Sequence, residues 1–181
     1  RGSHGGLAHV IHRMVRLLEA AGKDVVLVET VGVGQTELDI MCVADTVTVV
    51  LVPEAGDAIQ TMKAGLMEVG DIFVVNKSDR DGAQRLANSL DSTLNMGHEK
   101  KAWHPPVLLT KAHLGEGVDK VWNETQSHQR YLEESSLLMI KRVERRRKEF
   151  FETVERLLDE HVHRMAEQDT TLAKLVKSVE R

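Results

Sequence analysis

The sequence predicts an α/β fold of three layers, in which a mostly parallel sheet lies between helices, with an all-α arm after it. Three observations support this fold class. Four short apolar runs alternate with segments of helical periodicity over about residues 7–122. A polar loop follows each run at its carboxyl end. Beyond residue 126 the chain contains neither Gly nor Pro and keeps helical spacing. We therefore expect a domain over residues 1–125 and an arm over residues 126–181.

The individual elements follow in chain order. Apolar residues of Leu7–Ala21 fall on one helical face, and Gly22 is a natural stop. The four apolar runs are rich in β-branched residues, as is typical of strands buried on both faces of a parallel sheet. They span Asp24–Thr30, Thr46–Val52, Asp71–Asn76 and Pro106–Thr110. Further helices are expected at about Asp57–Val69, Arg80–Leu94, Gly117–Tyr131 and Ser136–Met165.

Composition excludes several classes of function. The 181 residues carry a net charge of −4, which excludes the strongly basic surface that binds nucleic acid. The single cysteine, Cys42, excludes an internal disulfide framework and a cysteine-rich zinc site. The longest apolar run is about one strand long, whereas a membrane span needs roughly 20 apolar residues. We therefore expect no nucleic-acid partner and no membrane partner.

Polar clusters lie at the end of every predicted strand. Parallel sheets bind ligands in the loops at the carboxyl ends of their strands. The clusters are Glu29–Gly32, Pro53–Asp57, Asn76–Asp79 and Thr110–Ala112. Four such clusters are difficult to explain in a purely structural chain, so we expect these loops to form a binding site.

The most specific cluster is Asn76-Lys77-Ser78-Asp79, which has the pattern N-K-x-D. The Asp79 carboxylate can accept hydrogen bonds from the adjacent N1–H and N2–H₂ groups of guanine. Adenine lacks this pair of donors and would leave the carboxylate unpaired. The stem of Lys77 can cover the base, and Asn76 can join neighbouring loops. The alternative is that Asp79 only caps a helix that begins at Arg80.

The cluster after the first predicted strand has the features of a magnesium and phosphate site. Glu29 ends the apolar run, where one carboxylate can hold Mg²⁺ or its water. Gly32 follows three residues later, and its N–H can approach a γ-phosphate because no Cβ intervenes. The alternative is a glycine-rich turn before a helix that begins near Thr36.

The last cluster, Thr110-Lys111-Ala112, is weaker by itself. The backbone N–H of Ala112 can bond guanine O6, but a plain strand-to-helix loop is the default. Together, the clusters follow the motif order of GTP-binding domains. The phosphate loop G-x-x-x-x-G-K-[ST] does not occur in the sequence, since Gly32–Thr36 lacks the lysine. The chain also begins with Arg1 instead of Met, so we expect the N-terminal strand and that loop upstream.

These residues resemble the MeaB/ArgK family of P-loop GTPases, the metallochaperones of adenosylcobalamin-dependent methylmalonyl-CoA mutase. The likeness covers nearly the whole chain. Its best-matching segments are Arg1–Ala8, Val28–Glu37, Pro53–Gly65, Val74–Asp79 and Gly115–Val118. The run VETVGVGQ within the second segment is highly specific to the family. The sequence departs from the family pattern at His4, Glu54 and Lys111, and Ser is usual at the position of Lys111.

The resemblance implies a P-loop NTPase-type G domain that binds GTP or GDP with Mg²⁺ and hydrolyses GTP. Glu29 would act at the Mg²⁺ or its water, and Lys63 would enter the site to stabilise charge during hydrolysis. The expected catalytic residues are thus Glu29, Gly32 and Lys63. The expected nucleotide-binding residues are Asn76, Lys77, Asp79, Lys111 and Ala112. A mobile switch segment would contain Pro53, Glu54, Gly56, Asp57 and Gln60.

The resemblance also implies a cellular role. The protein would gate cofactor loading or protection of methylmalonyl-CoA mutase or a related cobalamin-dependent acyl-CoA mutase. The arm would form a homodimer, and its wide apolar stripe needs to pack on the G domain or on another chain. The compartment would be the cytoplasm in a bacterium or the mitochondrial matrix in a eukaryote.

Other functions stay open at this point. Without the phosphate loop, the chain can be a nucleotide-binding-deficient module that only dimerises or contacts a partner. A GTPase or kinase linked to basic amino-acid transport, an older label of the family, needs a phosphorylatable partner. A nickel chaperone needs Cys and His loops, and the lone Cys42 speaks against it. The basic run Lys141–Lys148 is better explained as a solvated helix face than as a site for an acidic partner.

Overall fold

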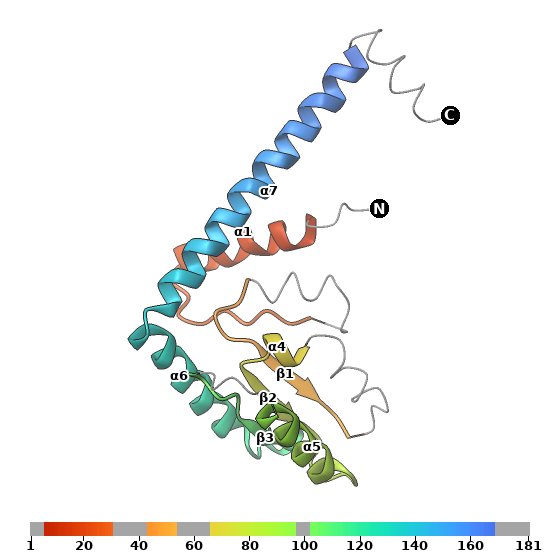
Figure 1. The fold of residues 1–181 in the computed structure, drawn as a ribbon, viewed down its shortest axis with the longest axis vertical. Helices are drawn as coiled ribbons and strands as arrows, with labels where there is room; N and C mark the ends of the chain where they lie inside the picture. The colour runs from red at the N-terminus through yellow and green to blue at the C-terminus, as the bar shows by residue number, and fades with distance from the viewer. Residues whose placement is uncertain (1–5, 31–42, 54–65, 97–101, 169–181) are drawn as a thin grey trace, which may run out of the picture. The chain divides into compact units, whose positions relative to one another are not determined.

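The architecture is a parallel sheet with helices between and after its strands (Figure 1). The computed structural model describes residues 6–30, 43–53, 66–96 and 102–168. The elements are α1 (Gly6–Ala20), β1 (Thr48–Leu51), α4 (Leu66–Val69), β2 (Ile72–Val75), α5 (Ala83–Asn95), β3 (Val107–Leu109), the 3₁₀ helix η1 (Ala112–Leu114), α6 (Val118–Glu134) and α7 (Leu137–Gln168). The chain divides into two compact units, Arg1–Lys141 and Arg142–Arg181.

The described strands form one parallel sheet in the order β1-β2-β3. In its register, Phe73 of β2 pairs with Val49 of β1 and with Val107 of β3. Helices separate the strands along the chain, with α4 before β2 and α5 before β3. The predicted α/β class is confirmed. Each of the three strands lies within two residues of its predicted ends.

The core lies on both faces of β2, all of whose residues are buried. Phe73 and Val75 belong to a cluster on one face with Val49, Leu51, Ala83, Ala87 and Leu90 of β1 and α5. Ile72 and Val74 alternate with them, so they point to the other face, and they are buried too. Both α5 and α6 contact β2. Because one face is taken by α5, we assign α6 to the other, which gives the three predicted layers.

The expected strand at Asp24–Thr30 is wrong: residues 25–30 form no strand with any described segment. Leu27 is 91% exposed and Val25 is 53% exposed. A strand needs a neighbour that satisfies its backbone hydrogen bonds. The apolar run predicts a buried strand, but it does not specify the neighbour on which pairing depends.

The helices agree with the sequence more closely. The ends of α1, α5, α6 and α7 lie within three residues of the predicted ones. Only Leu66–Val69 of the helix expected at Asp57–Val69 is described, as α4. The boundary suggested between residues 125 and 126 falls inside α6, and the first compact unit continues to Lys141. As a division between a nucleotide domain and a dimerisation arm, that boundary stays a prediction.

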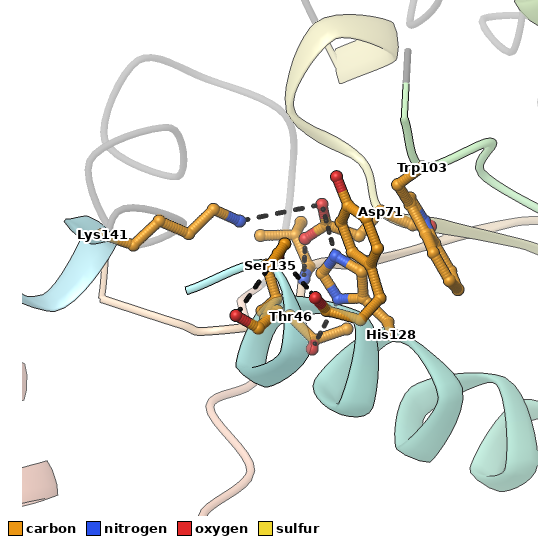
Figure 2. A network of polar contacts seen from close by, with 9 residues as sticks. Thr46, Asp71, Trp103, His128, Ser135 and Lys141 are labelled. Atoms are coloured by element: carbon orange, nitrogen blue, oxygen red, sulfur yellow. Dashed lines mark hydrogen bonds and ion pairs between the residues drawn. The ribbon is translucent and has the colours of Figure 1, made fainter. Parts of the chain in front are cut away.

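A buried polar network fastens α6 to the amino-terminal ends of the strands (Figure 2). His128 of α6 is 1% exposed. Its Nδ1 lies 2.9 Å from Oγ1 of Thr46, and its Nε2 lies 3.4 Å from Oδ1 of Asp71. A neutral imidazole with its proton on Nε2 satisfies both contacts, with the Thr46 hydroxyl donating to Nδ1. Thr46 lies just before β1 and Asp71 just before β2, so the imidazole connects the helix to the sheet.

Asp71 is the centre of this network. Its Oδ2 accepts a hydrogen bond from the N–H of Val47 at 2.8 Å, and its carbonyl accepts one from the indole N–H of Trp103 at 2.9 Å. The ammonium of Lys141 lies 4.0 Å from Oδ1. The ring of Trp103 also packs against His128, with centroids 4.7 Å apart. Through its carboxylate and its backbone carbonyl, Asp71 thus holds the segments that lead into β1 and β3 together with α6.

Burial lowers the pKa of His128 below its ordinary value of 6.5, because the charged imidazolium would lose its hydration. The charge of Asp71 opposes this effect, and that of Lys141 adds to it. Just below pH 6.5 the unfolded chain therefore binds more protons at this site than the folded chain. The contribution of His128 to the free energy of unfolding is complete above the pKa that this residue has in the unfolded chain. It is lost as the pH falls through the lower pKa that the residue has in the folded chain.

We predict that the free energy of unfolding falls more steeply below pH 6.5 in the unmodified chain than in His128→Gln. The glutamine amide does not titrate, so its variant lacks this contribution to the slope. Urea unfolding at pH 7.5 and at pH 5 measures the difference. His163→Gln is the matched control, which makes the same substitution at a side chain that is 74% exposed. Equal slopes in the unmodified chain and His128→Gln would contradict the prediction.

Candidate functional site

The loops after β1, β2 and β3 lie at the same edge of the sheet because the strands are parallel. The N–H of Asn76 donates to the carbonyl of Leu51 at 2.8 Å, which extends the pairing of β1 with β2. The N–H of Ser78 donates to the carbonyl of Thr110 at 3.0 Å. The fold therefore brings together Asn76–Asp79 and Thr110–Ala112, the clusters predicted to bind a nucleotide base.

The side chain of Asn76 joins these two loops. Its Oδ1 accepts one hydrogen bond from the hydroxyl of Thr110 and another from the backbone N–H of Ala112, both at 3.1 Å. Thr110 is 3% exposed, so this junction is anchored in the interior. Both lone pairs of the amide oxygen are used, which leaves the amide NH₂ group as the remaining donor of Asn76. The N–H of Ala112, expected at guanine O6, donates to Asn76 in this structure.

The backbone of the N-K-x-D loop is strained at one residue. Lys77 has a φ of 55°, in the left-handed region that costs a residue with a Cβ roughly 1 kcal/mol. The N–H of Arg80 closes the turn by donating to the Lys77 carbonyl at 3.0 Å. Strain of this kind is concentrated at binding sites, where surrounding contacts enforce it. Here the enforcing contacts come from Asn76 and Ser78, on either side of Lys77.

Asp79 is exposed, and its carboxylate makes no hydrogen bond or ion pair with another described side chain. The alternative that Asp79 caps the following helix is wrong. Helix α5 begins at Ala83, and its N-cap is Gly82, which has a φ of 90° and no side-chain cap. An exposed carboxylate on a loop that is bonded to its neighbour is available to accept hydrogen bonds from a ligand.

The loop after β3 is closed by an ion pair and a short backbone bridge. The N–H of Lys111 donates to the carbonyl of Glu116 at 2.9 Å, and the two residues form an isolated antiparallel bridge. The Lys111 ammonium lies 2.6 Å from Oε2 of Glu116. Gly115 and Gly117 adopt φ values of 73° and 80°, which only glycine reaches without strain. The loop therefore has a defined shape instead of being a loose connection.

The hydrogen bond to Glu116 and the charge of that residue raise the pKa of Lys111 above its ordinary value of 10.5. Burial opposes the rise slightly, and the charge of Asp79 adds a small contribution in the same direction. Lys111 therefore stays a cation at physiological pH, and its charge interacts with the carboxylates of Glu116 and Asp79.

The other residues predicted to belong to the site lie in different segments of the sequence from these two loops. Glu29 is exposed at the end of the unpaired segment, and Pro53 follows β1. The remaining catalytic and switch residues lie outside the described residues, namely Gly32, Glu54, Gly56, Asp57, Gln60 and Lys63. Their assigned roles stay predictions.

Sequence reasoning assigned no role to three features of the site. Thr110 was treated as part of a motif and not as the partner of Asn76. Glu116 has no individual role in the sequence analysis, because its bridge to Lys111 is a backbone contact. The left-handed backbone of Lys77 has no sequence signal, because lysine does not favour that conformation.

A nucleotide-bound Mg²⁺ is compatible with the residues present. Mg²⁺ keeps several waters and takes one or two carboxylates together with phosphate oxygens. Glu29 offers one exposed carboxylate for this purpose. Among the residues that the structure describes, no group of three or more His, Cys, Asp or Glu could hold a metal ion by itself.

A sequence profile described as "Methylmalonyl Co-A mutase-associated GTPase MeaB" matches residues 1–167. The chain belongs to the MeaB family of GTPases. The family assignment made from VETVGVGQ and the N-K-x-D loop is therefore confirmed, as is the P-loop GTPase fold class.

Similar proteins come from archaea, bacteria and animals. A relative from Pyrococcus horikoshii, named as a GTPase, is 48% identical over 145 residues, which are 78% of this chain and 46% of that protein. GTPase ArgK from Escherichia coli is 38% identical over 126 residues, 67% of this chain and 38% of that protein. The chain thus spans less than half the length of these MeaB-family relatives.

A solved structure titled "Crystal structure of LAO/AO transport system kinase" superposes with a TM-score of 0.75 and 30% identity. The match covers 87% of this chain and 51% of that one. Within the ranges described here, no helix is long and apolar enough to span a membrane.

We predict that Gly117→Ala destabilises the MeaB-family chain by about 2 kcal/mol. Its new Cβ would lie 2.6 Å from the carbonyl oxygen of Leu109, in addition to the cost of a φ of 80°. Gly115→Ala is the matched control, because its φ of 73° is similar but no atom lies within 4 Å of the added Cβ. Urea unfolding of both variants measures the difference. Equal losses would show that contact with β3 does not constrain this loop.

Proposed function

We propose that the gene product containing this chain binds GTP and GDP and hydrolyses GTP, with Asp79 selecting guanine. One observation carries the proposal. Asn76 joins its loop to the next through two hydrogen bonds of 3.1 Å, and the exposed Asp79 carboxylate of the same loop remains available. Membership of a GTPase family supports the same activity.

The chemistry of selection follows from hydrogen-bond donors. Guanine N1–H and N2–H₂ both donate to the two oxygens of Asp79 in a charge-assisted pair. The Asn76 amide NH₂ is a donor suited to an acceptor on the base edge, and the Lys77 stem covers the ring. Adenine would leave Asp79 without donors, and an unpaired charge of this kind is costly.

Hydrolysis needs the phosphate side of the site. Glu29 would hold Mg²⁺ directly or through water, and the metal would neutralise phosphate charge. The N–H of Gly32 would approach the γ-phosphate, and Lys63 would stabilise charge that develops during transfer. The switch segment, with Pro53, Glu54, Gly56, Asp57 and Gln60, would respond to the γ-phosphate.

The cellular role we infer is a chaperone that gates cofactor loading or protection of methylmalonyl-CoA mutase or a related cobalamin-dependent mutase. The family description names that mutase. A mouse relative, 33% identical over 145 residues, is named "Methylmalonic aciduria type A homolog, mitochondrial". The protein would act as a homodimer, in the cytoplasm of a bacterium or the mitochondrial matrix of a eukaryote. Exposed apolar residues of α7, including Phe150, Phe151 and Leu158, support a dimer through the arm.

We predict that Asp79→Asn weakens GDP binding by about 10- to 100-fold, the loss expected for one charge-assisted hydrogen-bonded pair. The asparagine amide can donate to the second carbonyl of xanthine, so xanthosine diphosphate should bind better than GDP. Calorimetry on the gene product that contains this chain measures both affinities. Asp81→Asn, at a nearby exposed aspartate, is the control and should change neither. An unchanged preference for guanine in Asp79→Asn would contradict the assignment.

We predict that Lys63→Ala slows GTP hydrolysis at least tenfold and leaves GTP affinity within about twofold. A side chain that acts mainly on the charge developing in the transition state contributes to turnover and little to binding. Single-turnover hydrolysis and nucleotide titration separate these quantities. Lys120→Ala, at an exposed lysine of α6, should alter neither. Equal losses in rate and affinity would count against the role of Lys63.

A further inference from the structure

Lys111 places a positive charge in the loop that is bonded to the N-K-x-D loop. Its side chain is 33% exposed. The loop that carries it is tied to the loop of Asp79 through the bonds from Ala112 to Asn76 and from Ser78 to Thr110. The charge of Asp79 contributes to the raised pKa of Lys111, so the two charges are near enough to interact.

A cation at this position creates a competition. The Asp79 carboxylate attracts an ammonium and the two N–H groups of guanine through the same oxygens. If Lys111 paired with Asp79, guanine would first have to break that ion pair. Lysine also has a flexible stem of four carbons, which would let it follow the carboxylate.

Glu116 lies where it can prevent this competition. It holds the Lys111 ammonium at 2.6 Å. The backbone bridge between Lys111 and Glu116 places their side chains on the same side of the loop, as directly opposed residues of an antiparallel pair are. The glycines on either side of Glu116 fix that bridge. Glu116 is therefore held in register with Lys111 by the main chain as well as by charge.

We propose that Glu116 is a positioning residue for guanine recognition, which keeps the Lys111 ammonium away from Asp79 and leaves that carboxylate open to the base. This inference rests on the proposed function, because it assumes that Asp79 reads guanine. It assigns Glu116 a role in nucleotide affinity without contact with the nucleotide.

The test compares the affinities of four proteins for the fluorescent probe mant-GDP. They are the unmodified gene product that contains this chain, Glu116→Gln, Lys111→Met and the double variant. Glu116→Gln should weaken binding by roughly twofold to fivefold, the range expected for an exposed ion pair that forms with Asp79. The double variant should bind more tightly than Glu116→Gln, because the competing ammonium is gone.

Recovery in the double variant separates this role from a structural one. If Glu116 only stabilised the shape of the loop, removing its partner as well would not restore binding. The loss in Glu116→Gln should also shrink as salt is raised, since ions screen an exposed charge pair. Glu160→Gln is the matched control, because Glu160 forms an ion pair of the same 2.6 Å length with Arg156, in α7.

Each outcome has a distinct meaning. Weaker binding in Glu116→Gln with recovery in the double variant supports the proposal. Unchanged binding in Glu116→Gln, or a loss that the double variant keeps, overturns the role of Glu116 while the proposed function stands. Absence of mant-GDP binding by the unmodified gene product contradicts the proposed function and this inference with it.

Discussion

The carboxyl edge of the sheet depends on the amide oxygen of Asn76. This atom accepts hydrogen bonds from Thr110 and from the N–H of Ala112, which belong to the loop after the neighbouring strand. The backbone bond from Ser78 to Thr110 joins the same two loops. A side-chain amide with both lone pairs occupied fixes the distance between the loops, and a base can be read only by groups held at fixed positions.

The two edges of the sheet have opposite characters. At the amino-terminal edge, His128 is buried and Asp71 is partly buried, and their polar atoms are satisfied within the chain, so the network contributes to rigidity. At the carboxyl edge, the carboxylate of Asp79 is exposed and the backbone of Lys77 is strained. A buried and satisfied network anchors α6 and the strands, whereas exposed and unsatisfied groups at the other edge are available to a ligand.

The features that depend on neighbouring residues in the sequence could be predicted from the sequence alone. Apolar runs predicted β1, β2 and β3, periodicity predicted the long helices, and N-K-x-D predicted a loop joined to its neighbour by Asn76. The prediction failed at Asp24–Thr30, because pairing depends on a neighbour that the run does not encode. The buried His128 and the hub at Asp71 were also missed, since contacts across more than 50 residues leave no local pattern. The closed Lys111–Glu116 loop was missed because its bridge is backbone geometry.

A structure of the gene product bound to GDP tests the central claim most directly, through the hydrogen-bond partners of Asp79 and Asn76. The account predicts that both guanine N–H groups donate to the Asp79 carboxylate, while the Asn76 oxygen keeps its bond from Thr110. A base bound away from Asp79, or a bound base with Thr110 and Asn76 separated, would contradict it.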